Sequence, residues 1–318
     1  MNSSLNKKLI SIIFSFRNEE ENLPELLSRI TRMFDSHLEA KYVLELIFVN
    51  DFSSDNSLNL LIEKSKTIPI KVLNMSRRFG VGPCVIAGLE FSKGDAVIYM
   101  DSDLQDPPEL IPELIKKFET GFDVIHTQRT KRLGENVFKM GVTSFAYKII
   151  NRFADIELPI NAGDFKLLSR RAVNEVLNMK EKDPYIRGLS VWVGFKQTLI
   201  PYVRQPRYSG KTQFKVLSKG PIFEFVRGIT SFSTVILFSS LLAGFFGLMI
   251  SFGLILYIII AKFNGLVTSG ITTIVLTVST LSSLILISNG ILSIYVAKLF
   301  EQTKSRPLYV VESIHTND

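Results

Sequence analysis

The chain has 318 residues, of which 46% are hydrophobic and 21% charged, with a formal net charge of +7. A chain of this length can form a complete α/β domain and one additional structural unit. One cysteine, Cys84, excludes an internal disulfide, and three scattered histidines do not have the spacing of a zinc site. Because no module of interleaved aromatic and basic residues is visible, we expect anionic lipid and phosphorylated substrates, not nucleic acid, to account for the basic excess.

Strand and helix patterns alternate over the first hundred residues. Apolar, β-rich runs predict strands at 9–16, 42–49, 70–75 and 96–100. Asn18 is expected to cap a helix with its apolar residues on one face, and further helices are expected after the polar turn 51–57 and over 81–91. This alternation predicts an α/β fold with a doubly wound, mostly parallel sheet.

Polar residues follow three of the predicted strands, at Asn18-Glu19, Asp51 and Asp101-Ser102-Asp103. Ligands of parallel sheets bind at the carboxyl ends of the strands, so we expect these residues to converge on one crevice. A hard cation such as Mg²⁺ or Mn²⁺ takes oxygen ligands and bridges to phosphates. Asp101 and Asp103 therefore predict a metal site for a nucleotide diphosphate. The alternative is an acidic turn, with Asp106 and Glu109 as the capping box of the next helix.

Two long uncharged stretches dominate the last third of the chain, residues 228–261 and 263–297. About 20 apolar residues already span a bilayer, so both predict transmembrane helices; a buried core hairpin is the alternative. Basic residues precede the first stretch and follow the second, while only Lys262 lies between them. The positive-inside bias then predicts a multi-pass protein of the inner (plasma) membrane with both termini cytoplasmic. Mixed apolar and basic residues at 211–230 predict interfacial amphipathic helices.

Six segments match, in order, the motifs of family 2 glycosyltransferases: 15–23, 49–55, 76–80, 100–109, 163–170 and 207–211. With its two predicted spans, the chain resembles the polyprenyl-phosphate glycosyltransferases, relatives of dolichol-phosphate mannose synthase and the bactoprenol glucosyltransferases. The resemblance implies a cytoplasmic GT-A-like domain over 1–210, interfacial helices over 211–230, a transmembrane hairpin over 231–300 and a cytoplasmic tail over 301–318. Ser15, Arg17 and Phe52 depart from the family pattern near the expected nucleoside pocket.

The implied reaction is the inverting transfer of a hexose from a nucleotide diphosphate sugar, with UDP-glucose as first choice, to polyprenyl (undecaprenyl) phosphate. The product would be a lipid-linked sugar for cell-envelope glycosylation. The resemblance implies three overlapping sets of residues and a place for one of them, Asp164. Asp101, Asp103 and Gln105 would hold Mg²⁺ or Mn²⁺; Glu19, Asp51, Arg77 and Asp101 would bind the donor; Asp101, Asp103 and Asp164 would be catalytic; and Asp164 would lie near the reacting sugar, unless it caps a turn.

The acceptor phosphate is already an anion, so it needs cationic positioning more than a general base. Arg129, Arg132 and Arg207 are the candidates for this contact. A solvated basic loop is the alternative for Arg129 and Arg132. Two other functions stay open at this stage, a processive polysaccharide synthase and a non-enzymatic membrane adaptor. The sequence also leaves open the donor sugar, the polyprenol length and whether copies form a homo-oligomer.

Overall fold

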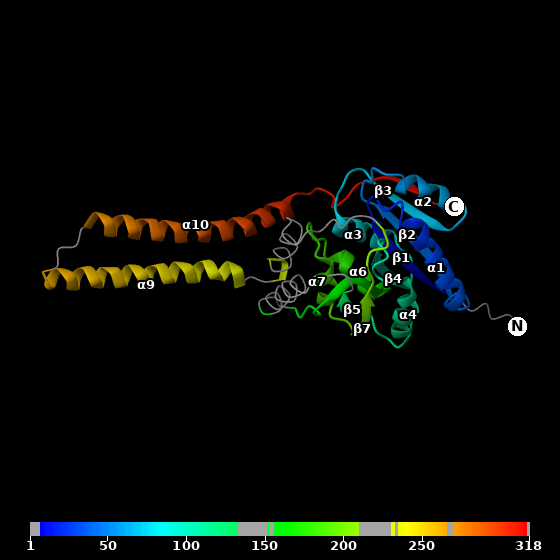
Figure 1. Ribbon diagram of the computed structural model, residues 1–318, viewed down its shortest axis with the longest axis horizontal. Helices are drawn as coiled ribbons and strands as arrows, with labels where there is room; N and C mark the ends of the chain where they lie inside the picture. The colour runs from blue at the N-terminus through cyan, green and yellow to red at the C-terminus, as the bar shows by residue number, and fades with distance from the viewer. Residues whose placement is uncertain are drawn as a thin grey trace. The chain divides into compact units, whose positions relative to one another are not determined.

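The structure is a computed structural model, and it describes residues 7–132, 152, 156–209, 230–232, 235–265 and 270–316. The chain divides into two compact units, one of residues 1–228 with 306–318 and one of residues 229–305 (Figure 1). Residues 211–229 of the predicted interfacial helices lie outside the described residues.

An eight-stranded sheet forms the centre of the first unit, in the order β7-β5-β6-β4-β1-β2-β3-β8. Strands β4, β1, β2 and β3 are parallel to one another, as are β5 and β7, whereas β6 and β8 run antiparallel to their neighbours. The prediction of a mostly parallel, doubly wound sheet is confirmed. The strands are β1 (Lys8–Phe16), β2 (Tyr42–Asn50), β3 (Ile70–Met75), β4 (Ala96–Asp101), β5 (Val124–Arg132), β6 (Ala162–Ser169), β7 (Gln197–Arg204) and β8 (Val311–His315).

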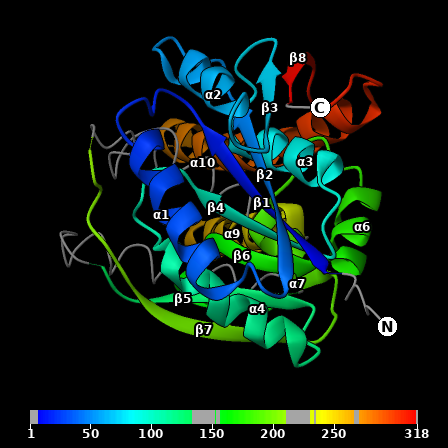
Figure 2. The ribbon, with the colours of Figure 1, turned by 90° about the vertical axis from the view of Figure 1, so that its right-hand side faces the viewer.

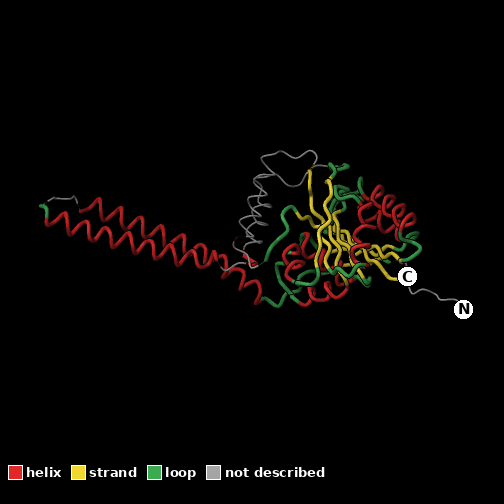
Figure 3. The backbone as a smooth tube through the Cα atoms, turned by 90° about the horizontal axis from the view of Figure 1, so that it is seen from below, coloured by secondary structure: helices red, strands yellow, loops and turns green. Residues whose placement is uncertain are grey.

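Helices cover both faces of this sheet (Figures 2 and 3). One face carries α1 (Leu23–His37), α2 (Ser57–Ser65), the short 3₁₀ helix η1 (Pro108–Leu110) and α4 (Ile111–Glu119), while the other carries α3 (Val81–Phe91), α6 (Arg170–Asn178) and α7 (Ile186–Trp192). Strands buried on both faces need apolar side chains in both directions, which explains the nearly continuous apolar runs of β1 and β2. In β1, Ile12 and Phe14 join the α1 side of the core, and Ile13 meets α3.

Helix α1 begins later than the sequence predicts. The expected cap at Asn18 is wrong, because the helix starts at Leu23 with Asn22 at its N-cap and Pro24 in its first turn. Proline fits the first turn of a helix because it has no N–H to satisfy there. Asn18 instead adopts the left-handed region, with φ of 56°. The residues between β1 and α1 therefore form a loop.

Most of the described part of the second unit lies in two helices that pack side by side, α9 (Val235–Phe263) and α10 (Gly270–Thr303). Their segments Leu242–Phe263 and Thr277–Thr303 are long and apolar enough to cross a membrane. Only 6% and 0% of the most apolar windows is buried, so the buried core hairpin is the wrong interpretation of these residues.

After α10, residues of the C-terminal segment return to the sheet as β8, which the sequence analysis did not predict. Strand β8 pairs antiparallel with β3, with Val72 opposite His315 and Asn74 opposite Ser313. It covers the edge of β3, whose N–H and C=O groups would otherwise be unpaired.

The contact between α3 and β1 leaves no room for a side chain at Gly88, and this gives a stability test. A Cβ at Gly88 would lie 2.3 Å from Ile13 Cγ2. We expect Gly88→Ala to lower the free energy of unfolding by about 1–3 kcal/mol. Thermal unfolding of the purified full-length protein in detergent would record a lower Tm. The same substitution should cost less in an Ile13→Ala background, and equal losses in both backgrounds would contradict the proposed clash.

Candidate functional site

Three loops meet at one edge of the sheet, after β1, β2 and β4. The strands end in register there, with Phe16 opposite Asn50 and Ser15 opposite Asp101. Each loop contains a non-glycine residue with positive φ: Asn18 at 56°, Phe52 at 59° and Leu104 at 60°. For bulky residues this conformation is unfavourable by about 1–2 kcal/mol. Backbone strain of this kind gathers at functional sites, so the loops mark this edge as the candidate site.

The acidic pair Asp101 and Asp103 lies on this edge, at the end of β4. Asp101 Oδ1 accepts a hydrogen bond from Tyr99 Oη at 3.3 Å, and Asp103 Oδ1 accepts one from the Gln105 N–H at 3.2 Å. Loss of hydration, with the negative charges of Asp103 and Asp164, raises the pKa of Asp101 to about 7. Loss of hydration also raises the pKa of Asp103. These carboxylates destabilise each other as anions.

A divalent cation fits this pair, because its charge would relieve the repulsion and it prefers oxygen ligands. In the part of the chain that the structure describes, no group of three or more His, Cys, Asp or Glu has the arrangement of a metal site. Asp101 and Asp103 are two carboxylates at the end of β4, with Gln105 two residues further along the chain. Mg²⁺ commonly binds in this way, through one or two carboxylates with water and substrate phosphate completing its shell.

Arg207 joins the acidic pair to the loop after β1. Its guanidinium donates a hydrogen bond to Glu19 Oε1, and its Nη1 lies 3.8 Å from Asp103 Oδ2. Burial raises the pKa of Glu19, although Asn22 and Arg207 oppose that shift by hydrogen bonding and charge. The structure therefore brings together three of the predicted residues, Glu19, Asp103 and Arg207. Helix α1 starts well after Glu19, so this residue is not part of its first turn.

A second cluster of buried charge involves Asp106. Asp106 is fully buried, and it accepts hydrogen bonds from Tyr202 Oη and, at 3.5 Å, from Arg129 Nη2. No side-chain hydrogen bond caps η1 or α4, and Glu109 forms an ion pair with Arg29. The capping box of Asp106 and Glu109 is therefore the wrong interpretation, because Asp106 is needed to neutralise Arg129.

Arg129 lies in a strand, not in a solvated loop. Strand β5 continues to Arg132, and Arg129 is 8% exposed. Its Nε donates to Tyr202 Oη at 3.0 Å, and a Cβ at Gly163 would lie 2.8 Å from its Nη2. The absence of a side chain at Gly163 thus makes room for the guanidinium. The side chain of Arg132 lies outside the described residues.

Asp164 pairs with an arginine that the sequence analysis missed. It lies inside β6, so it does not cap a turn, and Arg187 of α7 donates to both of its carboxylate oxygens, with Nε at 2.8 Å from Oδ1. Burial alone would raise the pKa of Asp164, but the charge and hydrogen bonds of Arg187 hold it well below its usual range. Asp164 is therefore a fixed negative charge that acts on Asp101.

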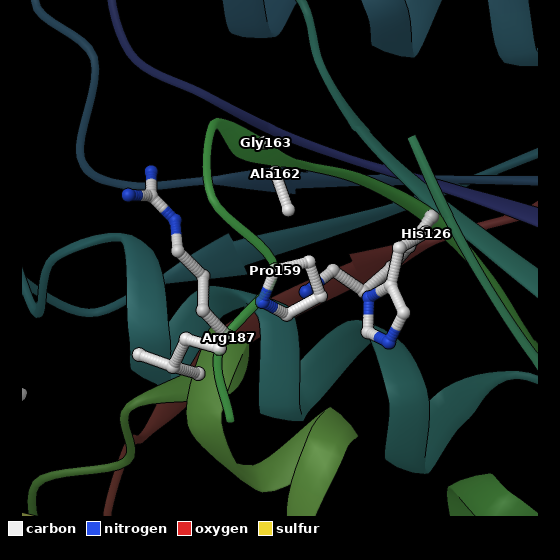
Figure 4. A pocket seen from close by; sticks show the side chains of 7 residues that line it. His126, Pro159, Ala162, Gly163 and Arg187 are labelled. Carbon is white, nitrogen blue, oxygen red and sulfur yellow. The ribbon is translucent and has the colours of Figure 1, made fainter. Parts of the chain in front are cut away.

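A small pocket lies beside this ion pair (Figure 4). His126, Pro159, Gly163, Lys166 and Arg187 are among its lining residues, and its volume is about 10 Å³, room for one water molecule. Lys166 is 1% exposed and donates to Ser190 Oγ at 3.0 Å. Burial lowers its pKa to about 8. With that volume, the pocket is too small to hold a sugar.

Asp51 and Arg77 have contacts of a different kind. The Asp51 carboxylate accepts hydrogen bonds from the N–H groups of Phe79, at 2.7 Å, and Gly80, at 3.1 Å. It thereby ties the loop after β2 to the loop before α3. The guanidinium of Arg77 lies 4.0 Å from the centre of the Phe79 ring. The described contacts of Asp51 thus link it to the β3–α3 loop and not to Glu19, Asp103 or Arg207.

Comparison with known proteins agrees with this architecture. A family model described as "Glycosyl transferase family 2" matches residues 11–177. The uncharacterized glycosyltransferase YkcC of Bacillus subtilis (strain 168) is 36% identical over 95% of this chain and 93% of its own length. The bactoprenol glucosyl transferase of Shigella phage SfX is 33% identical over 96% of this chain and 99% of its own. The prophage bactoprenol glucosyl transferase homolog of Escherichia coli (strain K12) is 32% identical, with coverage of 96% and 99%.

Solved structures are more distantly similar. A complex of glucosyl-3-phosphoglycerate synthase from Mycobacterium tuberculosis with Mn²⁺, uridine-diphosphate-glucose and phosphoglyceric acid has 18% identity and a TM-score of 0.47, over 70% of this chain and 77% of that one. The family match and the full-length relatives show that this protein, with its GT-A-like α/β unit, belongs to glycosyl transferase family 2.

Proposed function

We propose that the protein transfers a hexose, with inversion, from a nucleotide diphosphate sugar to a polyprenyl phosphate at the cytoplasmic face of the plasma membrane. UDP-glucose is the first choice of donor and undecaprenyl phosphate of acceptor; the product would be a lipid-linked sugar for the cell envelope. The observation that carries the proposal is the acidic pair Asp101 and Asp103 beside Arg207, at the carboxyl edge of a parallel sheet. The names and near-complete coverage of the bactoprenol relatives support the lipid acceptor.

The donor would bind along the edge formed by β4, β1 and β2. Asp101 and Asp103, with Gln105, would hold Mg²⁺ or Mn²⁺, which supplies positive charge to the departing nucleotide diphosphate when bound. The carboxylate of Glu19 would accept hydrogen bonds from ribose hydroxyls. Asp51 would contact the base side, and Arg77 would neutralise diphosphate charge. Asp164, held by Arg187, would orient the reacting sugar or the acceptor.

The acceptor phosphate would attack the anomeric carbon without a strong general base. Arg129, Arg132 and Arg207 are proposed to grip it. Arg207 is the best placed of the described arginines, because it already contacts Asp103 and Glu19 at this edge. A phosphate group would compete with these carboxylates for the guanidinium, which binds phosphate in a bidentate manner.

Helices α9 and α10 are proposed to cross the membrane as a hairpin and so to anchor the protein to the bilayer that contains the lipid acceptor. Strand β8 follows the hairpin in sequence, and β3 precedes it, yet both belong to one sheet. This shared sheet supports the proposal that both ends of the hairpin lie on the same side of the membrane, with an even number of crossings. Basic residues outside the hairpin favour the cytoplasmic side.

The reaction itself can be tested with labelled donors. Membranes containing the protein would be incubated with a panel of radiolabelled nucleotide sugars and undecaprenyl phosphate, and the lipid then extracted. We expect a singly glycosylated phospholipid from UDP-glucose, and no product from the polyprenol that lacks phosphate, because the arginines require an anion. A growing polymer would favour the processive synthase, and no product with any donor would favour the adaptor.

Metal dependence can be tested at the acidic pair. We expect EDTA to abolish transfer and Mg²⁺ or Mn²⁺ to restore it. Asp103→Asn should lower kcat by about a hundredfold or more, the scale on which removal of charge stabilisation acts. Glu109→Gln is the matched control, because Glu109 belongs to the same acidic stretch but pairs with Arg29 on the surface. Wild-type turnover by Asp103→Asn would overturn the metal role of this residue.

The role of Arg207 can be tested by charge removal. Arg207→Gln should raise the KM for polyprenyl phosphate and lower kcat/KM about ten- to a hundredfold, since a charge-assisted bidentate contact is lost. Arg29→Gln, which removes an arginine paired on the surface, should leave both constants near their original values. An unchanged acceptor KM in Arg207→Gln would remove Arg207 from the acceptor site.

A further inference from the structure

A chain of hydrogen bonds runs from the C-terminal strand to the loops of the candidate donor site. Glu312 of β8 accepts a hydrogen bond at Oε2 from Asn74 Nδ2 at 2.9 Å, and Asn74 Oδ1 accepts one from Asn50 Nδ2 at 2.8 Å. Asn50 Oδ1 in turn accepts from the Ser53 N–H at 3.0 Å, and Ser53 Oγ accepts from the Asn18 N–H at 3.0 Å. The chain thus crosses β8, β3 and β2 and ends in the loop after β1.

The direction of these bonds is determined at both ends. The Ser53 N–H can only donate, and the carboxylate of Glu312 can only accept, so both side-chain amides between them must point the same way. Asn50 is 1% exposed and Asn74 is 9% exposed. A reversed Asn50 amide would place a donor against the Ser53 N–H in a buried setting, where water cannot compensate. Glu312 therefore stabilises the one orientation in which Asn50 holds the loop after β2.

The C-terminal segment makes two further contacts, one with the loop between β3 and α3 and one with α3 itself. The backbone oxygen of Val310 accepts a hydrogen bond from the Ser76 N–H at 3.0 Å, and Tyr309 Oη donates to Glu90 of α3. Ser76 is the first residue after β3 and opens the loop that carries Arg77. In that loop, the N–H groups of Phe79 and Gly80 bind Asp51. The backbone of Val310 thus supports the β3–α3 loop and the side chain of Glu312 supports the loop after β2, whereas Tyr309 contacts only α3.

We propose that β8 helps to shape the donor site, and that Glu312 acts as a positioning residue. Glu312 sets the Asn74 and Asn50 amides, and these hold the loops that carry Glu19 and Asp51 in the conformation that receives the nucleotide. The inference rests on the proposed function, because the ligand it positions is the nucleotide diphosphate sugar. A strand that only protected the edge of β3 would not require a side chain aligned with this internal chain of amides.

The experiment compares three variants of the full-length protein in detergent. Glu312→Ala removes the terminal acceptor, whereas Glu312→Gln retains a side-chain oxygen that can accept from Asn74. Tyr309→Phe is the matched control, because it removes a hydrogen bond of the same segment that does not enter the chain of amides. Two readouts are taken, the binding of UDP by calorimetry with donor KM and kcat, and amide hydrogen exchange of peptides covering residues 17–20 and 51–57.

We expect Glu312→Ala to weaken UDP binding and to raise the donor KM about three- to tenfold, with kcat within about twofold, because the lost hydrogen bond is to a solvent-exposed carboxylate and acts on the site only through the two amides. Exchange at Ser53 and Asn18 should accelerate by a similar factor. Glu312→Gln and Tyr309→Phe should stay near wild type in all measurements. A general loss of folding would instead lower kcat and speed exchange throughout the sheet.

Several outcomes would overturn the proposal. Wild-type exchange at Ser53 in Glu312→Ala would show that the chain of hydrogen bonds does not hold the loop. Equal effects of Tyr309→Phe and Glu312→Ala, or exchange accelerated throughout the sheet, would show that β8 only protects the edge of β3. If the wild-type protein binds no nucleotide, the proposed function fails and so does the donor-positioning role, while hydrogen exchange still reports separately whether Glu312 orders the loops.

Discussion

The repulsion between the two carboxylates at the end of β4 is the constraint on which the rest of the site depends. Asp101 and Asp103 lie one residue apart, with the carboxylates of Asp164 and Asp106 near enough to affect them. Like charges removed from water destabilise each other unless cations are supplied. Nearby arginines supply part of this positive charge. A divalent metal would supply the rest.

Arginine, more than lysine, provides the compensating charge around this pair. Arg207 meets Asp103 and Glu19, Arg129 meets Asp106, and Arg187 meets Asp164. A guanidinium keeps its charge when it is buried and offers several donors in a fixed plane, so one side chain can hold two acceptors. Lys166, which is fully enclosed, has its pKa lowered to about 8 by burial. The arginines therefore hold the carboxylates in fixed positions. Charged groups that are already in place need no rearrangement during a reaction.

The sheet edge combines parts of the chain that are far apart in sequence. Residues near 18, 51 and 101 come from the first third of the chain, Asp164 and Arg207 from its middle, and β8 from its end. Because β8 follows both long apolar helices in sequence, the edge near the donor loops is complete only when the chain beyond them has folded back. The sheet that carries the proposed donor site would then be completed by a strand that follows the proposed membrane hairpin.

Local patterns determined much of this protein. The apolar runs at 42–49 and 70–75 and the helix at 81–91 predicted elements that the structure contains almost residue for residue, since strand and helix periodicity reflect burial directly. The position of Asp101 and Asp103 at the end of a parallel strand was predictable for the same reason. The two long uncharged stretches likewise predicted α9 and α10, because their composition is itself the signal.

Tertiary contacts decided the remainder. Asp106 had the spacing of a helix cap but pairs with Arg129, and Arg187 belongs to no recognisable motif although it donates to both carboxylate oxygens of Asp164. Strand β8 could not be read from a short polar segment, because its partner β3 lies more than two hundred residues earlier. Sequence patterns indicate which residues are buried and which polar residues are candidates for ligand binding. Which buried charge neutralises which, and which strand completes the sheet, depends on distances that exist only after the chain has folded.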